Sequence, residues 1–146
     1  MSSNTPEAID FDAMNRPVIA EFRQTGGKAG GVFEGKPLVL VHHAGAKSGV
    51  QRIAPLVPLL DGDRIFVFAS KGGADTNPDW YHNLVAHPNT VVEFGSETFP
   101  VTVRVLTGDE RDAIYAKQSA VEPQFAEYQR KTTRVIPVLE LQRAAG

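Results

Sequence analysis

Apolar residues fall in short continuous runs or alternate with polar ones over most of the chain, a pattern typical of β-strands. It predicts strands over residues 38–42, 52–60, 64–70, 90–94, 97–106 and 136–141. Gly95 and Ser96, between two of these strands, are typical of a hairpin turn. Pro55 and Pro58 cannot donate to a strand ladder, so the strand over 52–60 is expected at a sheet edge or with a bulge.

Helical spacing of apolar residues is confined to shorter stretches. It predicts a helix over about residues 15–25, with Pro17 in its first turn and Gly26 and Gly27 at its end.

Three further helices are indicated by residues that favour helix starts. Asn77 followed by Pro78 has the order of an N-cap and a first helical residue, and Thr107 with Glu110 has capping-box spacing. Pro123 is expected to begin a last short helix.

These elements together predict an α+β domain built on a small barrel of mostly antiparallel strands. Strands and helices do not alternate along the chain, which argues against a doubly wound nucleotide-binding fold. Residues 1–14 are polar and expected to form a mobile amino-terminal segment, and residues 15–146 a single domain.

Composition excludes several classes of protein. A net charge of -2, from 15 basic and 17 acidic residues, argues against a nucleic-acid binder. The absence of cysteine excludes disulfides, zinc–thiolate sites and thiol nucleophiles. No secretory signal and no apolar run long enough for a membrane span is visible, so a cytoplasmic protein is expected. Peripheral contact with a membrane is left open.

One short segment has the composition of an anion-binding loop. In GAKSG, residues 45–49, glycines permit backbone N–H groups to converge, while Lys47, Ser48 and the nearby Arg52 add positive charge and a hydroxyl donor. It lacks the Walker spacing. The alternative is a surface hairpin with a solvated lysine.

A second segment repeats this combination at another strand end. Ser70, Lys71, Gly72 and Gly73 again place a hydroxyl, a cation and two glycines together, and Lys28 and Lys36 flank a third glycine-rich stretch. The three segments predict a ligand that carries several negative charges along its length.

Other candidate residues are open to a structural interpretation. Trp80 could fill the core or wall a planar ring, and Asn83 could cap a loop. Phe125 and Tyr128 share one helix face, as core residues or as the cover of a pocket. His42 and His43 point to opposite faces of a strand, and no metal site is expected.

The motifs occur in an order that resembles a known family. FR…GGK…GG is followed by GAKSGxxR…PL, F.FASKGG, NPxWYHNLxAHPxxxVE and YQRxTxRxIPVxxL, from Pro17 to Arg143. This order is similar to that of the deazaflavin-dependent nitroreductases, the coenzyme F-420-dependent quinone reductases of actinobacteria. The resemblance implies a split β-barrel of the FMN-binding type and hydride transfer from reduced 8-hydroxy-5-deazaflavin to a quinone, nitroaromatic or activated enone.

The resemblance also implies roles for individual residues. Lys47, Ser48 and Arg52 match positions that hold the cofactor's phosphate, Pro55 and Trp80 positions near its ring, and Ala46 stands where the family often has arginine. The cofactor-binding residues expected are Lys47, Ser48, Gly49, Arg52, Pro55, Ala69, Ser70, Lys71, Gly72, Gly73 and Trp80.

Phe125 and Tyr128 are expected in the acceptor pocket, with Tyr128 as a proton donor. The alternatives are an FMN-dependent oxidoreductase of the same fold and a non-catalytic cofactor-binding module. The chain is expected to be a monomer or a homodimer.

Overall fold

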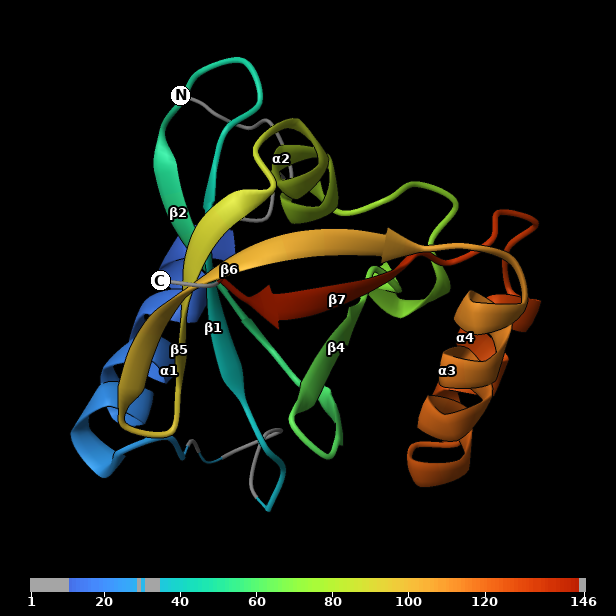
Figure 1. Cartoon of the computed structure of the whole chain (residues 1–146), viewed down its shortest axis with the longest axis horizontal. Coiled ribbons are helices and arrows are strands. Elements are labelled where there is room, and N and C mark those ends of the chain that lie inside the picture. The colour runs from blue at the N-terminus through green and yellow to red at the C-terminus, as the bar shows by residue number, and fades with distance from the viewer. Residues whose placement is uncertain (1–10, 29, 31–34, 145–146) are drawn as a thin grey trace, which may run out of the picture.

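The computed structural model of the chain describes residues 11–28, 30 and 35–144. The strands of these residues form one antiparallel sheet in the order β2-β1-β5-β6-β7-β4-β3 (Figure 1). They are β1 Val39–Ala44, β2 Gln51–Leu56, β3 Leu59–Asp61, β4 Arg64–Phe68, β5 Asn89–Phe94, β6 Glu97–Leu106 and β7 Val138–Arg143. The Gly95–Ser96 hairpin is confirmed, because β5 and β6 pair with Phe94 opposite Glu97.

The sheet curls into a half-barrel for a reason visible in its connections. Strands β2 and β3 lie at opposite edges of the sheet, yet only Val57 and Pro58 separate them in the chain. Because a trans peptide step spans at most about 3.8 Å, the two edges must approach each other at this end. The α+β split β-barrel is therefore confirmed, whereas the single strand expected over residues 52–60 is wrong. Pro58, which lacks an N–H group for a ladder, lies at the break.

The helices cover both faces of this curled sheet. They are α1 Phe11–Thr25, α2 Asp79–Ala86, α3 Gly108–Val121 and α4 Gln124–Arg130, with a short 3-10 turn, η2 Lys71–Gly73. Helix α1 packs through Phe22 on Leu38 and Leu40. Helix α2 contributes Leu84 to the central core cluster, which includes Val39 and Val41. Helix α3 packs through Ile114 on a second cluster, which includes Phe66 and Phe68. Of the segment 1–14, residues 11–14 belong to α1, and residues 1–10 lie outside the described residues.

Three helix starts differ from expectation, the first because α1 begins earlier than predicted, at Phe11, and the other two because tertiary partners bind the side chains expected to cap them. Pro17 lies inside α1, not in its first turn. Pro78 is the N-cap of α2, while the Asn77 side chain accepts a hydrogen bond from Arg134. Thr107 caps α3 without a side-chain bond, since Glu110 instead binds Arg104, so the predicted capping box is wrong.

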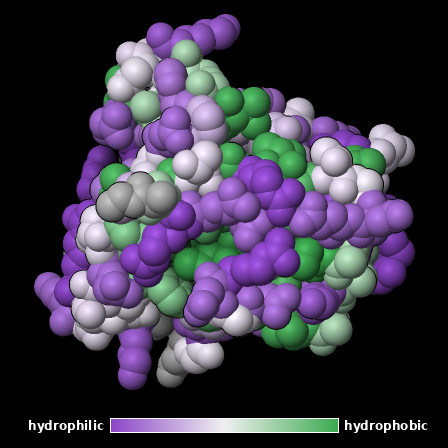
Figure 2. All heavy atoms as spheres, in the orientation of Figure 1, coloured by the Kyte–Doolittle hydropathy of each residue, from purple (hydrophilic) through white to green (hydrophobic). Residues whose placement is uncertain are grey.

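A buried carboxylate joins three neighbouring strands of the sheet. Glu140 of β7, only 5% exposed, accepts hydrogen bonds from Arg64 of β4 at 2.9 Å and from Arg104 of β6 at 2.8 Å. These bonds, first that from Arg64, lower the pKa of Glu140 to about 2. Figure 2 shows the largely hydrophilic surface over β6 and β7.

Candidate active site

The loop between β1 and β2 is built to turn tightly. Gly49 has a φ of +72°, which a residue with a side chain rarely adopts, and its N–H donates to Gly45 O at 2.9 Å. A Cβ at Gly45 would lie 2.3 Å from Ser48 Oγ, so a side chain at this position would displace the Ser48 hydroxyl. The loop and helix α2 enclose a hollow of about 290 Å³, the loop hollow, lined by Gly45, Ala46, Lys47, Ser48, Arg52, Asp79, His82 and Asn83.

Buried side chains hold this loop from below. Ala46 N–H donates to Asn83 Oδ1 at 2.9 Å, and Asn83 Nδ2 lies 2.9 Å from His43 Nδ1. Because Asn83 Oδ1 accepts from the backbone, its amide nitrogen faces the histidine and donates to Nδ1, which places the proton of neutral His43 on Nε2. The prediction that Asn83 caps a loop is confirmed.

The second predicted loop, which follows β4, is strained and tied down. Lys71 has a φ of +47°, an uncommon conformation for a residue with a side chain, which costs of order 1–3 kcal/mol and is frequent at functional sites. Gly73 has a φ of +86°, and a Cβ there would lie 2.9 Å from Tyr128 O. The loop is thereby packed against helix α4.

Arg134 fixes the same loop through its guanidinium group. It donates to the carbonyls of Ala69, Ser70 and Ala74 at 3.1, 2.8 and 2.7 Å and to Asn77 Oδ1 at 2.7 Å. Partial burial lowers the pKa of Arg134, but the group stays charged at neutral pH. Sequence reasoning gave Arg134 no role, although it lies in the last motif of the family pattern.

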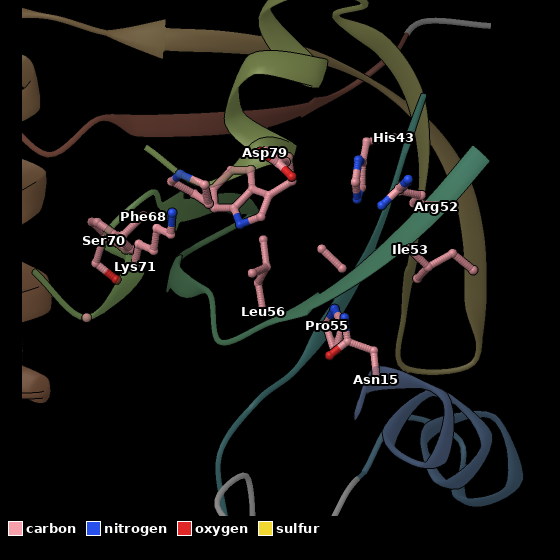
Figure 3. Close-up of a pocket in the computed structure, with 14 residues that line it drawn as sticks. Asn15, His43, Arg52, Ile53, Pro55, Leu56, Phe68, Ser70, Lys71 and Asp79 are labelled. Atoms are coloured by element: carbon pink, nitrogen blue, oxygen red, sulfur yellow. The ribbon is translucent and has the colours of Figure 1, made fainter. Parts of the chain in front are cut away.

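Between the two loops lies the central hollow, of about 440 Å³ (Figure 3). It shares Arg52 and Asp79 with the loop hollow. Figure 3 shows His43 and Arg52 on one side and Ser70 and Lys71 on the other, with Leu56 between them. Its lining is Asn15, His43, Arg52, Ile53, Ala54, Pro55, Leu56, Phe68, Ser70, Lys71, Gly72, Pro78, Asp79 and Trp80.

Trp80 packs on the core and also borders the central hollow, so its predicted place beside a planar ring stays a prediction. It packs against the central core cluster, as does Tyr81, and it also lines the central hollow. An indole with one face on the core can present other atoms to a ligand without leaving its packed position.

A third space, the aromatic hollow, continues from the central one with about 360 Å³. The two share Pro55, Leu56, Phe68, Ser70 and Gly72. The aromatic hollow is completed by Lys36, Val57, Glu122, Gln124, Phe125 and Tyr128.

Edge-to-face contacts order the aromatic wall. The ring of Phe125 lies 5.1 Å from that of Tyr128 and 5.6 Å from that of Phe68. Behind them Tyr115 donates to Phe125 O at 2.7 Å, and burial raises the pKa of this tyrosine.

The geometry thus brings together most of the predicted residues and leaves three away from the hollows. One continuous groove is lined by the others, which are Lys47, Ser48, Arg52, Pro55, Ser70, Lys71, Gly72, Trp80, Phe125 and Tyr128. Gly49 shapes the first loop, Gly73 packs on Tyr128, and Ala69 is fully buried in the core.

The groove also contains residues that sequence reasoning missed. His43 and Asn15 line the central hollow, and Asp79 lines both that hollow and the loop hollow. In the part of the chain that the structure describes, Asp79 is the one acidic residue in these two linings, against Lys47, Arg52 and Lys71, so the two hollows together have a cationic excess. Among the described residues, no group of three acidic or histidine side chains could hold a metal ion.

The groove's residues fall within a segment that matches a known family. Residues 14–142 match the family model described as F420H(2)-dependent quinone reductase. A protein of Mycobacterium tuberculosis named F420H(2)-dependent quinone reductase is 36% identical over 128 residues, which cover 85% of this chain and 86% of that relative.

Solved structures give the same answer for the fold. A structure titled F420-H2 dependent reductase has 39% identity and a TM-score of 0.66, and covers 73% of this chain and 94% of its own. Another, titled domain-swapped dimer, has 33% identity and a TM-score of 0.69 over 92% of this chain and 100% of its own. A heme storage protein of Vibrio cholerae, at 16% identity and a TM-score of 0.55, shares the fold alone.

Proposed function

Because the chain belongs to the family of F420H(2)-dependent quinone reductases, we propose that it passes a hydride from reduced coenzyme F-420 to a quinone-type acceptor in the groove between Lys47 and Tyr128. The observation that carries this assignment is the order of the three hollows. A cationic loop hollow, a central hollow with both apolar and charged lining, and an aromatic hollow adjoin one another and share lining residues. This membership does not favour the FMN-dependent and non-catalytic alternatives.

The residues present suit the charged part of the cofactor. Lys47, Ser48 and Arg52 offer two positive charges and a hydroxyl beside a turn in which a side chain at Gly45 would displace the Ser48 hydroxyl. Charge-assisted hydrogen bonds to such groups are about twice as strong as neutral ones. We assign the phosphate to the loop hollow and the negatively charged tail to Lys71 and its glycine turn.

The central hollow suits a flat ring system. Pro55, Leu56, Phe68 and Trp80 supply apolar surface, and the bound cofactor supplies the hydride from a carbon of its ring. The chain's own contribution is to orient the ring, to place the acceptor against it and to exclude water. Arg134 and Asn83 act as positioning residues, because they fix the two loops that border this hollow.

The aromatic hollow is assigned to the acceptor. Phe125 and Phe68 offer apolar surface for a quinone, a nitroaromatic or an activated enone. Reduction of a quinone to a quinol takes one hydride and one proton, and the Tyr128 hydroxyl is assigned to deliver the proton or a hydrogen bond to the acceptor oxygen.

Assembly and membrane contact are separate questions. The relative titled domain-swapped dimer favours a homodimer for this chain, which light scattering on the purified protein would test. Among the described residues, no helix is both long and apolar enough to cross a bilayer. Peripheral contact stays a prediction that sedimentation with vesicles can test.

Turnover tests the proposed function. Purified protein is mixed with reduced coenzyme F-420, and the return of the oxidised cofactor's absorbance is followed after menadione or a nitroimidazole is added. We expect acceptor-dependent oxidation with menadione. No turnover with a broad panel of quinones would contradict the proposal.

A further inference from the structure

Two oppositely charged side chains, Lys36 and Glu122, line the aromatic hollow and have no part in the function proposed so far. Lys36 Nζ donates to Glu122 Oε1 at 2.8 Å. Lys36 precedes β1, whereas Glu122 lies at the junction of α3 and α4, so the pair joins segments 86 residues apart at the edge of this hollow.

The pair is better held than most surface ion pairs. The side chains of Lys36 and Glu122 are 33% and 19% exposed, and Gln124 Nε2 also donates to Glu122 Oε1 at 2.8 Å. The bonds from Lys36 and Gln124 lower the pKa of the Glu122 carboxyl, which is therefore ionised at neutral pH. The position of the lysine ammonium is set by a carboxylate that is itself fixed.

Lys36 is the one cation that lines the aromatic hollow among the described residues. Its ammonium has three donors, and one of them binds Glu122. The neighbouring lining of Pro55, Val57 and Phe125 is apolar, which strengthens any hydrogen bond that a ligand makes there.

We propose that Lys36, held by Glu122, determines acceptor specificity, and that the enzyme prefers quinones with an anionic substituent on the ring edge that faces Lys36. This inference rests on the proposed function and names its substrate class. An anionic group would gain a charge-assisted hydrogen bond. A hydrocarbon tail in the same place would desolvate the charges of Lys36 and Glu122 without forming a hydrogen bond to either of them.

A pair of acceptors of similar size tests this preference. Menadione carries a methyl group where 1,4-naphthoquinone-2-sulfonate carries an anion. The two differ in intrinsic reactivity, so the readout is the ratio of their kcat/KM values, sulfonate over menadione, compared between wild type and variants. Intrinsic reactivity cancels in that comparison.

Two substitutions should move this ratio in opposite directions. Lys36→Met removes the cation and leaves a carboxylate beside the acceptor, and we expect the ratio to fall roughly tenfold. Glu122→Gln removes the repelling carboxylate and frees Lys36, and we expect the ratio to rise about threefold. A pair that only ties two segments together would lower turnover of both acceptors in parallel.

Matched controls separate a local effect from net charge. Lys117→Met and Asp61→Asn each break an exposed ion pair of 3.0 Å. Neither residue lines any of the three hollows, so both variants should leave the ratio unchanged. An unchanged ratio in both Lys36→Met and Glu122→Gln, or parallel losses, would overturn the inference while wild-type turnover keeps the proposed function. Loss of F-420 affinity in Lys36→Met would overturn it by moving Lys36 to the cofactor. No wild-type turnover of either acceptor would overturn this inference, and no turnover with a broad panel of quinones would refute the proposed function as well.

Discussion

Replacing Arg134 with methionine should destabilise the protein and weaken cofactor binding together. The guanidinium makes four hydrogen bonds to the segment from Ala69 to Asn77, at 2.7 to 3.1 Å. Methionine keeps much of the side-chain volume but donates none of these bonds. The lost contacts all lie on the loop that carries Ser70 and Lys71 into the central hollow.

The magnitude follows from the kind of bond and from what replaces it. A hydrogen bond to a charged group contributes about 1.5–3 kcal/mol, so four independent bonds would exceed the loss expected here. The four bonds share one guanidinium, and the carbonyls of the half-buried Ser70 and Ala74 can bind water instead. A fixed arginine side chain also loses as much as about 2 kcal/mol of rotamer freedom. We expect a loss of about 2–4 kcal/mol in the free energy of unfolding.

Urea unfolding and a coenzyme F-420 titration measure the two effects. Arg130→Met is the matched control, because it breaks an exposed ion pair with Glu127 on helix α4. The control should change stability by less than about 1 kcal/mol. The prediction is refuted if the free energy of unfolding of Arg134→Met lies within about 0.5 kcal/mol of the wild-type value, because this arginine would then not hold the loop.

Three further predictions concern binding, turnover and pH. Lys47→Ala and Arg52→Ala should each weaken F-420 binding by roughly 1.5–3 kcal/mol, measured by fluorescence titration, and unchanged affinity in both would remove the loop hollow from the site. Tyr128→Phe should lower kcat more than it changes F-420 affinity, and wild-type kinetics would discard its role as proton donor. The pKa of Glu140 is depressed to about 2 in the fold, so its stabilising effect is present above its unfolded pKa of about 4.5 and is lost as pH falls towards 2. Glu140→Gln should therefore flatten the acid limb of stability against pH in thermal unfolding, and an unchanged limb would contradict this account.

Most strands of the barrel could be predicted because the residue pattern that defines a strand or a tight turn lies within a short stretch of sequence. Alternating apolar positions and a Gly95–Ser96 turn define β5 and β6 without reference to the rest of the chain. The break at Val57–Pro58 could not be predicted in this way, since it depends on where the two ends of the sheet lie in space. The capping box failed for a similar reason. Glu110 pairs with Arg104 on a neighbouring strand and not with the helix start.

The candidate site also contains features that could be predicted from neighbouring residues and features that depend on residues distant in the sequence. The two glycine loops were visible because glycine, lysine and serine stand next to one another in the chain. Arg134 binds carbonyls 60 to 65 residues earlier, and Lys36 binds Glu122 across 86 residues. No spacing rule for helices or strands reveals such partners. Asn83 was expected to cap a loop, but only the fold shows that the loop is the one carrying Ala46.

The central claim is that the groove binds coenzyme F-420, and a fluorescence titration tests it most directly. Purified wild-type protein is titrated with F-420 and, in parallel, with FMN, with Arg52→Ala as the variant in the loop hollow. We expect micromolar or tighter binding of F-420, no saturable binding of FMN and weaker F-420 binding by the variant. Binding of FMN alone, or of neither compound, would contradict it.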